Sequence, residues 1–194
     1  SERIHKYNPQ LNAIVIDNTE EALKKAKAYD TTQCDGRIAG VPVTVKEAFN
    51  MKGLKSTVNF KAFANYVARE DSVVVDRIYR ENGIILGKTN IPVLLGDHQS
   101  FGPLYPTANK PWDTNKTPGG STGGGAAAVA AGLTTFEIGS DIGGSIRVPS
   151  HFCGVFGLKP SENMYVELGH LPAKPSSNYG WIQMASYGPL ARSM

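Results

Sequence analysis

Short apolar runs alternate with amphipathic stretches along this chain, a pattern typical of α/β proteins. The β-branched run at 11–16 predicts a buried strand. A helix is expected from about position 18 to position 30, with glutamates in its first turn and lysines later. The stretch 40–46 predicts a second strand, and Pro42 favours an edge position or a strand start.

The second half of the chain continues the same alternation. Apolar residues at helical spacing predict a helix over 72–82, and the run at 84–87 predicts a strand directly after it. Prolines punctuate 96–112, which indicates a long loop, before a small-residue helix at 125–131 and a strand at 133–138. We therefore expect one α/β domain with a mixed, mostly buried β-sheet flanked by helices.

Composition excludes several classes of protein. With 41% apolar and 19% charged residues the chain is expected to be globular, and a net charge of +3 is too small to indicate a nucleic-acid partner. The longest apolar run, 126–131, is far too short to span a membrane. Cys34 and Cys153 do not form a disulfide framework, and no secretory signal opens the sequence, so we expect a cytoplasmic protein.

Glycine is concentrated in one part of the chain. Positions 117–160, 44 residues in all, hold 11 of the 21 glycines, with serines and threonines among them. Because glycine loses the most conformational entropy on folding, such a cluster is expected only where the function requires backbone without side chains. Backbone without side chains can approach a ligand closely and point several N–H groups at one spot. The pattern predicts a site for a developing negative charge, with serines around it.

Other chemistries fit the sequence poorly. The segment 83–89 resembles a phosphate-binding loop but has three residues between its glycines instead of four, and its middle reads as strand. The four histidines and two cysteines lack metal-binding spacing, so no metal and no cofactor is expected. The segment 144–147 fails the G-x-S-x-G pattern of a nucleophile elbow, and His98 is better interpreted as a loop or pocket-wall residue.

Lys46, Ser121 and Ser145 remain as candidates for catalysis. Most lysines lie at the surface, and serines between glycines are often turn residues. However, Lys46 ends a largely apolar strand where burial is plausible, and a buried lysine has a lowered pKa that makes it a competent general base. Each serine follows a glycine pair at the boundary of a predicted element, which makes two ordinary turn serines a less satisfactory interpretation.

Segment 118–161 resembles the signature of the amidase signature family in nearly continuous register. Upstream, 40–47 resembles the strand of that family that carries its catalytic lysine, and 87–92, 109–113 and 188–193 also fit. The three matching motifs are Gly119-Gly120-Ser121-Thr122-Gly123-Gly124, Gly139-Ser140-Asp141-Ile142-Gly143-Gly144-Ser145-Ile146-Arg147-Val148-Pro149 and Phe152-Cys153-Gly154-Val155-Phe156-Gly157-Leu158-Lys159-Pro160.

The resemblance implies a Lys–Ser–Ser catalytic triad. It makes Lys46 the base, Ser121 the relay after a cis peptide bond, and Ser145 the nucleophile. The oxyanion hole is expected from the backbone N–H groups of Ile142, Gly143, Gly144 and Ser145. Thr122, Asp141 and Arg147 are expected to support the site without taking part in the reaction, and an ion pair between the last two is a guess.

Two positions depart from the usual form of the signature. Thr122 stands where a second serine is usual, and Gly125 stands where serine is common; we expect neither to matter much. Family members are usually longer at both ends. Residues 1–194 are therefore expected to form the N-terminal and central part of the catalytic domain, with the remainder beyond the ends of the chain.

The expected activity is hydrolysis of the carbon–nitrogen bond of a linear small-molecule amide through an acyl-enzyme, with esters as further possible substrates. One alternative is the glutamine-hydrolysing amidase subunit of a tRNA-dependent amidotransferase. The loop 96–100 differs from the loop expected in that subunit, which favours a stand-alone amidase. The other alternative is a non-catalytic protein of the same fold. A homodimer is possible, and Phe49, Leu95, His98 and Tyr165 are candidate pocket walls.

Overall fold

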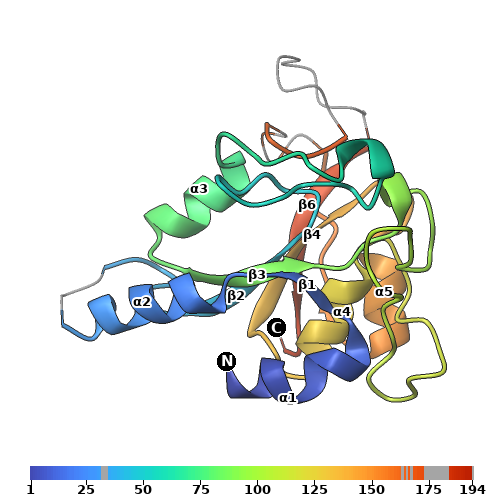
Figure 1. Ribbon diagram of the computed structural model, residues 1–194, viewed down its shortest axis with the longest axis horizontal. Coiled ribbons are helices and arrows are strands. Elements are labelled where there is room, and N and C mark those ends of the chain that lie inside the picture. The colour runs from blue at the N-terminus through green and yellow to red at the C-terminus, as the bar shows by residue number, and fades with distance from the viewer. Residues whose placement is uncertain (32–34, 163, 165, 167, 173–183, 194) are drawn as a thin grey trace.

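A six-stranded mixed β-sheet forms the centre of the molecule, with helices on both faces (Figure 1). The computed structural model describes residues 1–31, 35–162, 164, 166, 168–172 and 184–193. Along the sheet the strand order is β1-β3-β2-β4-β6-β5. The strands are β1 (Ile14–Asp17), β2 (Pro42–Lys46), β3 (Ile84–Thr89), β4 (Phe136–Asp141), β5 (Phe156–Gly157) and β6 (Ser186–Ala191).

The three central strands, β3, β2 and β4, are parallel, whereas β1, β6 and β5 pair in antiparallel fashion. The carboxyl ends of β2 and β4 therefore lie at the same edge of the sheet, which is where open α/β sheets build their sites. The predicted mixed α/β sheet is thus confirmed.

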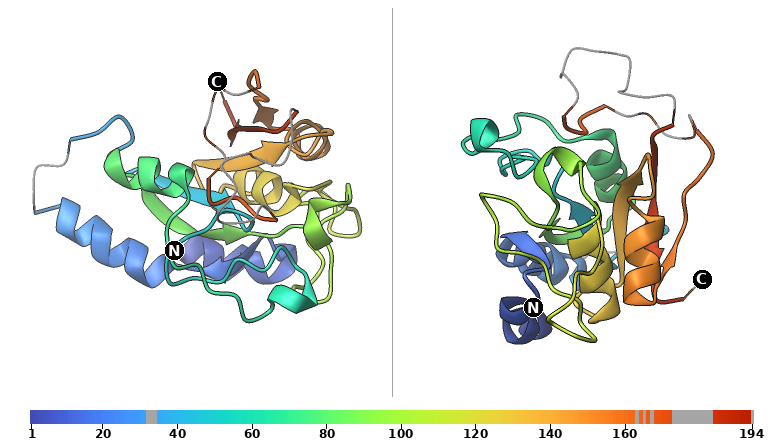
Figure 2. Two further views of the ribbon diagram at one scale, coloured as in Figure 1. Left: turned by 90° about the horizontal axis from the view of Figure 1, so that it is seen from above. Right: turned by 90° about the vertical axis from the view of Figure 1, so that its right-hand side faces the viewer.

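Helices cover the two faces of the sheet unequally. On one face lies α3, whose N-cap Ser72 accepts a hydrogen bond from Val75 N–H at 3.3 Å. On the other face α4 packs on the sheet, with α1 and α5 beside it (Figure 2). The helices are α1 (Glu2–Leu11), α2 (Thr19–Tyr29), α3 (Val73–Arg80), α4 (Gly123–Ala130) and α5 (Arg147–Cys153), and short 3₁₀ turns occur at Lys61–Phe63 and Val93–Leu95.

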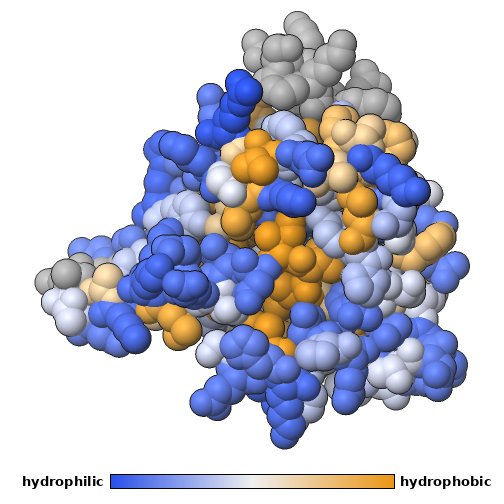
Figure 3. Space-filling model, in the orientation of Figure 1, coloured by the Kyte–Doolittle hydropathy of each residue, from blue (hydrophilic) through white to orange (hydrophobic). Residues whose placement is uncertain are grey.

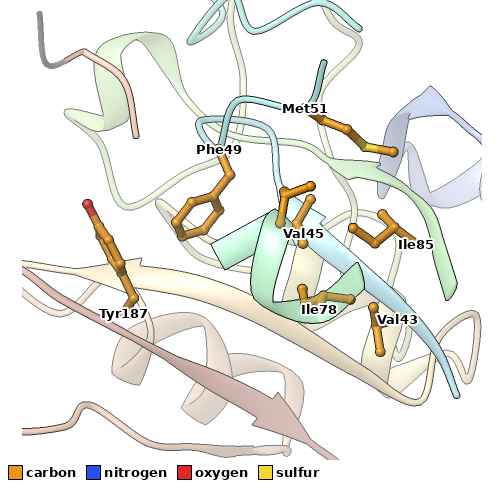
Figure 4. Packing of buried hydrophobic residues seen from close by; sticks show 8 residues of the cluster. Val43, Val45, Phe49, Met51, Ile78, Ile85 and Tyr187 are labelled. Carbon is orange, nitrogen blue, oxygen red and sulfur yellow. The ribbon is translucent and has the colours of Figure 1, made fainter. Parts of the chain in front are cut away.

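The hydrophobic core between α3 and the sheet is built from branched aliphatic and aromatic side chains (Figure 4). Val43 and Val45 of β2 point toward α3, where Ile78 meets them. Because side chains alternate along a strand, Thr44 and Lys46 project to the opposite face. The residue pattern of β2 thus sends its lysine toward α4.

Small residues let α4 lie very close to the sheet. All eight of its residues are glycine, alanine or valine, and all are buried. A Cβ atom on Gly124 would lie 2.5 Å from the carbonyl oxygen of Ala13, so no larger residue fits there without displacement. This close approach fixes the segment that precedes the helix against the carboxyl ends of the central strands.

Two predicted elements needed correction. Leu11 is the last residue of α1 and not part of a strand, because the Asn8 side chain accepts hydrogen bonds from Ala13 and Ile14 N–H and delays β1 to Ile14. The predicted strand 133–138 begins later, at Phe136. Of the two alternatives predicted for Pro42, an edge position or a strand start, the second is confirmed, because Pro42 begins the central strand β2.

The view in Figure 3 shows a mostly hydrophilic surface with a strip of apolar residues over the strands. Among the described residues, no helix is long and apolar enough to cross a membrane. Cys153 is fully buried, as expected for a packing residue, and Cys34 lies outside the described residues.

Candidate active site

The candidate site lies where the parallel strands β2 and β4 end. Lys46 is the last residue of β2, and Ser140 and Asp141 are the last two of β4. The segment that enters α4 brings Ser121 to the same place, two residues before the helix begins. Residues 75 positions apart in the sequence, Lys46 and Ser121, thereby come into hydrogen-bonding contact.

Lys46 is completely buried, and its amine is surrounded by hydroxyl and carbonyl oxygens. The Nζ atom lies 2.7 Å from Ser121 Oγ, 3.0 Å from Ser140 Oγ and 3.2 Å from the Ser140 carbonyl oxygen. Burial lowers the pKa of Lys46 from 10.5 to about 7, although the charges of Glu137 and Asp141 act in the opposite direction. A substantial share of neutral amine is therefore available near neutral pH.

The position of Ser121 is fixed by backbone contacts of the residues beside it as well as by the hydrogen bond to Lys46. The Gly120–Ser121 peptide bond is cis, as the resemblance implied, and the side chain is buried. A Cβ atom on Gly120 would lie 2.5 Å from the carbonyl oxygen of Asp97, so the chain before Ser121 packs directly on a neighbouring loop. The next residue, Thr122, donates its N–H to the Ser145 carbonyl oxygen at 3.1 Å, which ties the two serine segments together.

The carboxylate of Asp141 organises the loop that carries Ser145. It accepts hydrogen bonds from the backbone N–H groups of Gly144 (2.8 Å), Ile146 (2.9 Å) and Arg147 (3.2 Å). The Arg147 guanidinium adds an ion pair at 2.9 Å, so the guessed pair exists. Burial alone would raise the pKa of Asp141, but the bonds from Arg147 and the backbone outweigh it and lower the pKa to about 2.

These contacts reduce the number of backbone N–H groups that are available for the predicted oxyanion hole. The Gly144 N–H already donates to Asp141, so the prediction needs correction at this residue. Gly144 has φ 117°, a conformation that favours glycine, and its role is to shape the loop. The prediction that the N–H groups of Ile142, Gly143 and Ser145 serve this purpose remains, and the first two residues are exposed.

Ser145 is partly exposed and lines a pocket of about 480 Å³ together with Ser121 and Ser140. Within the described part of the chain, no hydrogen bond joins the hydroxyl groups of Ser121 and Ser145. Of the four predicted pocket walls, Leu95 and His98 do line the pocket. Phe49 is buried in the core instead, because its ring packs on His170 and Tyr187, and Tyr165 lies outside the described residues.

Three residues at the site were not predicted: Ser140, Glu137 and His170. Ser140 contacts Lys46 twice, and His170 Nε2 lies 3.0 Å from Ser140 Oγ. Ser140 belongs to the glycine-rich motif, and its hydroxyl between Gly139 and Asp141 is the sequence signal for its place at the site. Nothing in the sequence near His170 indicates its position, because it lies 30 residues further along the chain.

Glu137 lies fully buried on β4 and accepts a hydrogen bond from Thr89 Oγ1 at 2.6 Å. Burial raises its pKa to about 7, and the charge of Lys46 opposes that shift. A Cβ atom on Gly125 would lie 2.6 Å from the Glu137 side chain. Glycine at 125 thus leaves the room that the Glu137 side chain occupies, and a serine there would require that side chain to move.

A second buried lysine supports the neighbouring segment. Lys88 Nζ lies 2.6 Å from Ser56 Oγ, and Glu47, next to Lys46, accepts backbone N–H bonds from Thr57 and Val58. Within the described residues, no cluster of three or more His, Cys, Asp or Glu side chains could hold a metal ion.

A family model described as Amidase matches residues 1–194. A glutamyl-tRNA(Gln) amidotransferase subunit from Chlamydia pneumoniae is 39% identical over 99% of the chain, which covers 38% of that relative's length. A structure titled as 6-aminohexanoate cyclic dimer hydrolase complexed with substrate has a TM-score of 0.85 and 29% identity, over 99% of this chain and 39% of that one. One titled simply as an amidase has a TM-score of 0.85 and 32% identity, over 99% and 43%. The chain thus spans about two fifths of the length of the proteins it matches.

Proposed function

This chain belongs to the amidase family, and on that basis we propose that it hydrolyses the carbon–nitrogen bond of a linear small-molecule amide through a serine acyl-enzyme. The observation that carries the proposal is the fully buried Lys46 amine, 2.7 Å from Ser121 Oγ, beside a pocket that Ser145 lines. A base with a pKa of about 7 suits proton transfer near neutral pH.

In the proposed reaction Ser145 Oγ attacks the amide carbonyl carbon. The Ser145 proton passes to Ser121, whose own proton passes to the neutral amine of Lys46. The C–N bond then breaks, and the proton on Lys46 returns through Ser121 to the departing nitrogen. A water molecule attacks the acyl-enzyme by the same relay, which releases the carboxylic acid and restores Ser145.

The negative charge that forms on the carbonyl oxygen needs donors placed in advance. Backbone N–H groups of Ile142, Gly143 and Ser145 are proposed for this task, and loss of one such donor typically costs about 3 kcal/mol. Asp141 fixes the loop through Gly144 and Ile146, so these donors need little rearrangement during the reaction. The relay also requires the Ser145 hydroxyl to turn toward Ser121 when substrate binds.

Labelling with a fluorophosphonate tests the proposal without knowledge of the substrate. We expect the intact protein to be labelled at Ser145, and Ser145→Ala to lose both the label and amide hydrolysis. Ser150→Ala is a matched control, because Ser150 is a buried serine five residues away whose hydroxyl has no partner among the described residues. Label at another serine, or a Ser145→Ala variant with full activity, would contradict the proposal.

The second candidate is the amidase subunit of a tRNA-dependent amidotransferase, which the curated relatives favour. It predicts glutamine hydrolysis that appears only when companion subunits are present. Steady hydrolysis of simple amides by the isolated protein favours the first candidate. Activity on glutamine restricted to a reconstituted complex favours the second.

A further inference from the structure

A hydrogen-bonded chain continues behind Lys46, away from Ser121. Its members are the Ser140 hydroxyl, 3.0 Å from Lys46 Nζ, and His170 Nε2, 3.0 Å from the Ser140 hydroxyl. The His170 ring stacks on Tyr187 at 4.9 Å and meets Phe49 edge-on at 4.8 Å. Its position is therefore fixed by packing, and the ring can impose an orientation on the small hydroxyl beside it.

The available donors and acceptors determine which group donates in each hydrogen bond between Lys46, Ser140 and His170. A neutral lysine amine has two N–H donors and one lone pair. If the lone pair is to take the proton of Ser121, both N–H groups must go elsewhere, and the remaining neighbours within hydrogen-bond distance are the carbonyl and hydroxyl oxygens of Ser140. The Ser140 hydroxyl then accepts from Lys46, so its own proton must be donated to another group. His170 Nε2 is the described atom placed to accept it.

We propose that neutral His170, with its proton on Nδ1, is a positioning residue that turns the Ser140 hydroxyl so that the lone pair of Lys46 faces Ser121. This inference rests on the proposed function, because it assigns Lys46 as base. Without an acceptor at His170, the Ser140 proton can turn to the Lys46 lone pair and compete with Ser121. With a proton on Nε2, His170 would itself donate to Ser140 and force the same unproductive orientation.

The electrostatic surroundings keep His170 neutral. Packing of its ring inside the protein, and then the charge of Lys46, lower the pKa of His170 to about 3. Glu137 and Asp141 on β4 are the acidic groups whose charges act on Lys46. Hence His170 stays neutral over the pH range in which Lys46 titrates, and its Nδ1–H tautomer can accept the Ser140 proton throughout.

Two variants at one position separate this role from a purely structural one. His170→Phe keeps a ring against Phe49 and Tyr187 but has no acceptor, whereas His170→Gln places an amide oxygen near the site of Nε2. We expect the fluorophosphonate labelling rate of Ser145 at its high-pH plateau to fall roughly tenfold in His170→Phe, the effect of one neutral hydrogen bond. In His170→Gln it should stay within about threefold of the original protein.

The pH profile adds a signature that loss of packing does not produce. In His170→Phe the free Ser140 proton stabilises the neutral amine of Lys46, so the acid limb of the labelling rate should move to lower pH while the plateau falls. Combining His170→Phe with Ser140→Ala should be no slower than Ser140→Ala alone, because His170 acts through Ser140. An unshifted limb, or rate losses that multiply in the double variant, would overturn the inference.

A direct measurement covers the case in which a variant fails to fold. Nitrogen-15 NMR of histidine-labelled protein distinguishes the two neutral tautomers, and we expect the Nδ1–H form at His170 from pH 5 to pH 9. An Nε2–H tautomer would refute the inference even if Ser145 is labelled as proposed. If Ser145 is not labelled in the original protein, the proposed function fails instead, and that result is distinct from either outcome at His170.

Discussion

Burial decides the chemistry at the level of single residues. Lys46 has no exposed surface, so its charged form loses the stabilisation that water gives to an ammonium group. Its described neighbours supply oxygens from Ser121 and Ser140 but no carboxylate in direct contact. A lysine in such surroundings is ready to accept a proton, whereas the same residue at a strand end in water would hold its proton up to high pH.

The rate of the reaction should therefore fall on the acid side of neutrality. As the proposed base, Lys46 must be unprotonated, so activity is expected to be lost as the pH falls through about 7. Glu137 raises the pKa of Lys46 through its charge, so Glu137→Gln should move this limb to lower pH and leave the plateau nearly unchanged. Fluorophosphonate labelling rates measured from pH 5 to pH 9 test both points. A limb that stays in place or moves to higher pH in Glu137→Gln would contradict this account.

The two members of the Asp141–Arg147 pair should differ sharply when removed. The Asp141 side chain is fully buried and holds three backbone N–H groups, whereas the Arg147 side chain is 54% exposed. We expect Asp141→Ala to lower the free energy of unfolding by about 3 kcal/mol and to abolish labelling, because buried N–H groups lose their partner. Arg147→Ala should cost under about 1 kcal/mol. Chemical denaturation of both variants measures the difference, and equal losses would show that the ion pair matters more than the backbone bonds.

The same carboxylate gives the stability of the protein a pH dependence at low pH. The pKa of Asp141 is lower in the folded protein than the usual 3.8, so its contribution is full above that value. It is lost as the pH falls toward about 2.

At the level of elements, α4 shows why the site is compact. The helix is packed so closely on the sheet that the size of a residue in α4 limits the size of the residue that faces it on β4. Gly125 and Glu137 are such a pair. The large Glu137 side chain on β4 requires a residue without a side chain at position 125 of α4. At this contact the Glu137 side chain itself fills the space beside Gly125, and because it is fully buried it has little room to move.

Substitution at this contact should show strong coupling. Gly125→Ser forces Glu137 to move, and we expect the free energy of unfolding to fall by about 2 kcal/mol. Adding Glu137→Ala removes the obstructing group, so the double variant should recover most of that loss relative to Glu137→Ala alone. Thermal unfolding of the two single variants and the double variant gives the coupling. Additive losses would mean that the serine is accommodated elsewhere.

The elements and the catalytic candidates were largely predictable from the sequence, for physical reasons. Acidic residues followed by lysines indicated α2, apolar residues at helical spacing indicated α3, and the glycine-rich motif placed Ser121 and Ser145 at the start or end of elements. Asn8 was not predictable as the residue that delays β1, because side-chain capture of backbone N–H groups leaves no periodic pattern. The contact of His170 with Ser140 was hidden for a related reason: it depends on the path of the chain after α5, and no local pattern encodes that path.

At the level of the whole molecule, the strands that carry the site are also the best protected. Both β2 and β4 are flanked by strands on either side, and helices lie over both faces of the sheet. The antiparallel strands β1 and β5 are at the ends of the described sheet. The molecule thus places Lys46 and Asp141 at the ends of strands inside the sheet, while Ser145 lies on a loop that leads into α5.

Hydrogen exchange should map this gradient of stability. Peptides that contain Pro42–Lys46 and Phe136–Asp141 are expected to exchange slowest, and α2, with most of its residues exposed or half-buried, should exchange faster by a factor of about 10 or more. Mass spectrometry of deuterated protein over seconds to hours measures this. Equal protection of α2 and the central strands would show that the chain opens only as one unit.

The contact between Gly120 and Asp97 has a consequence for attempts to redesign this protein. The stretch around Leu95 and His98 lines the pocket, so it is the natural place to graft a loop that accepts a different molecule. Yet its backbone rests directly on the residue before Ser121. A graft there would press on Gly120 and displace Ser121, the proposed proton relay, so a variant with altered selectivity is expected to turn over more slowly unless the grafted loop keeps the space around Gly120.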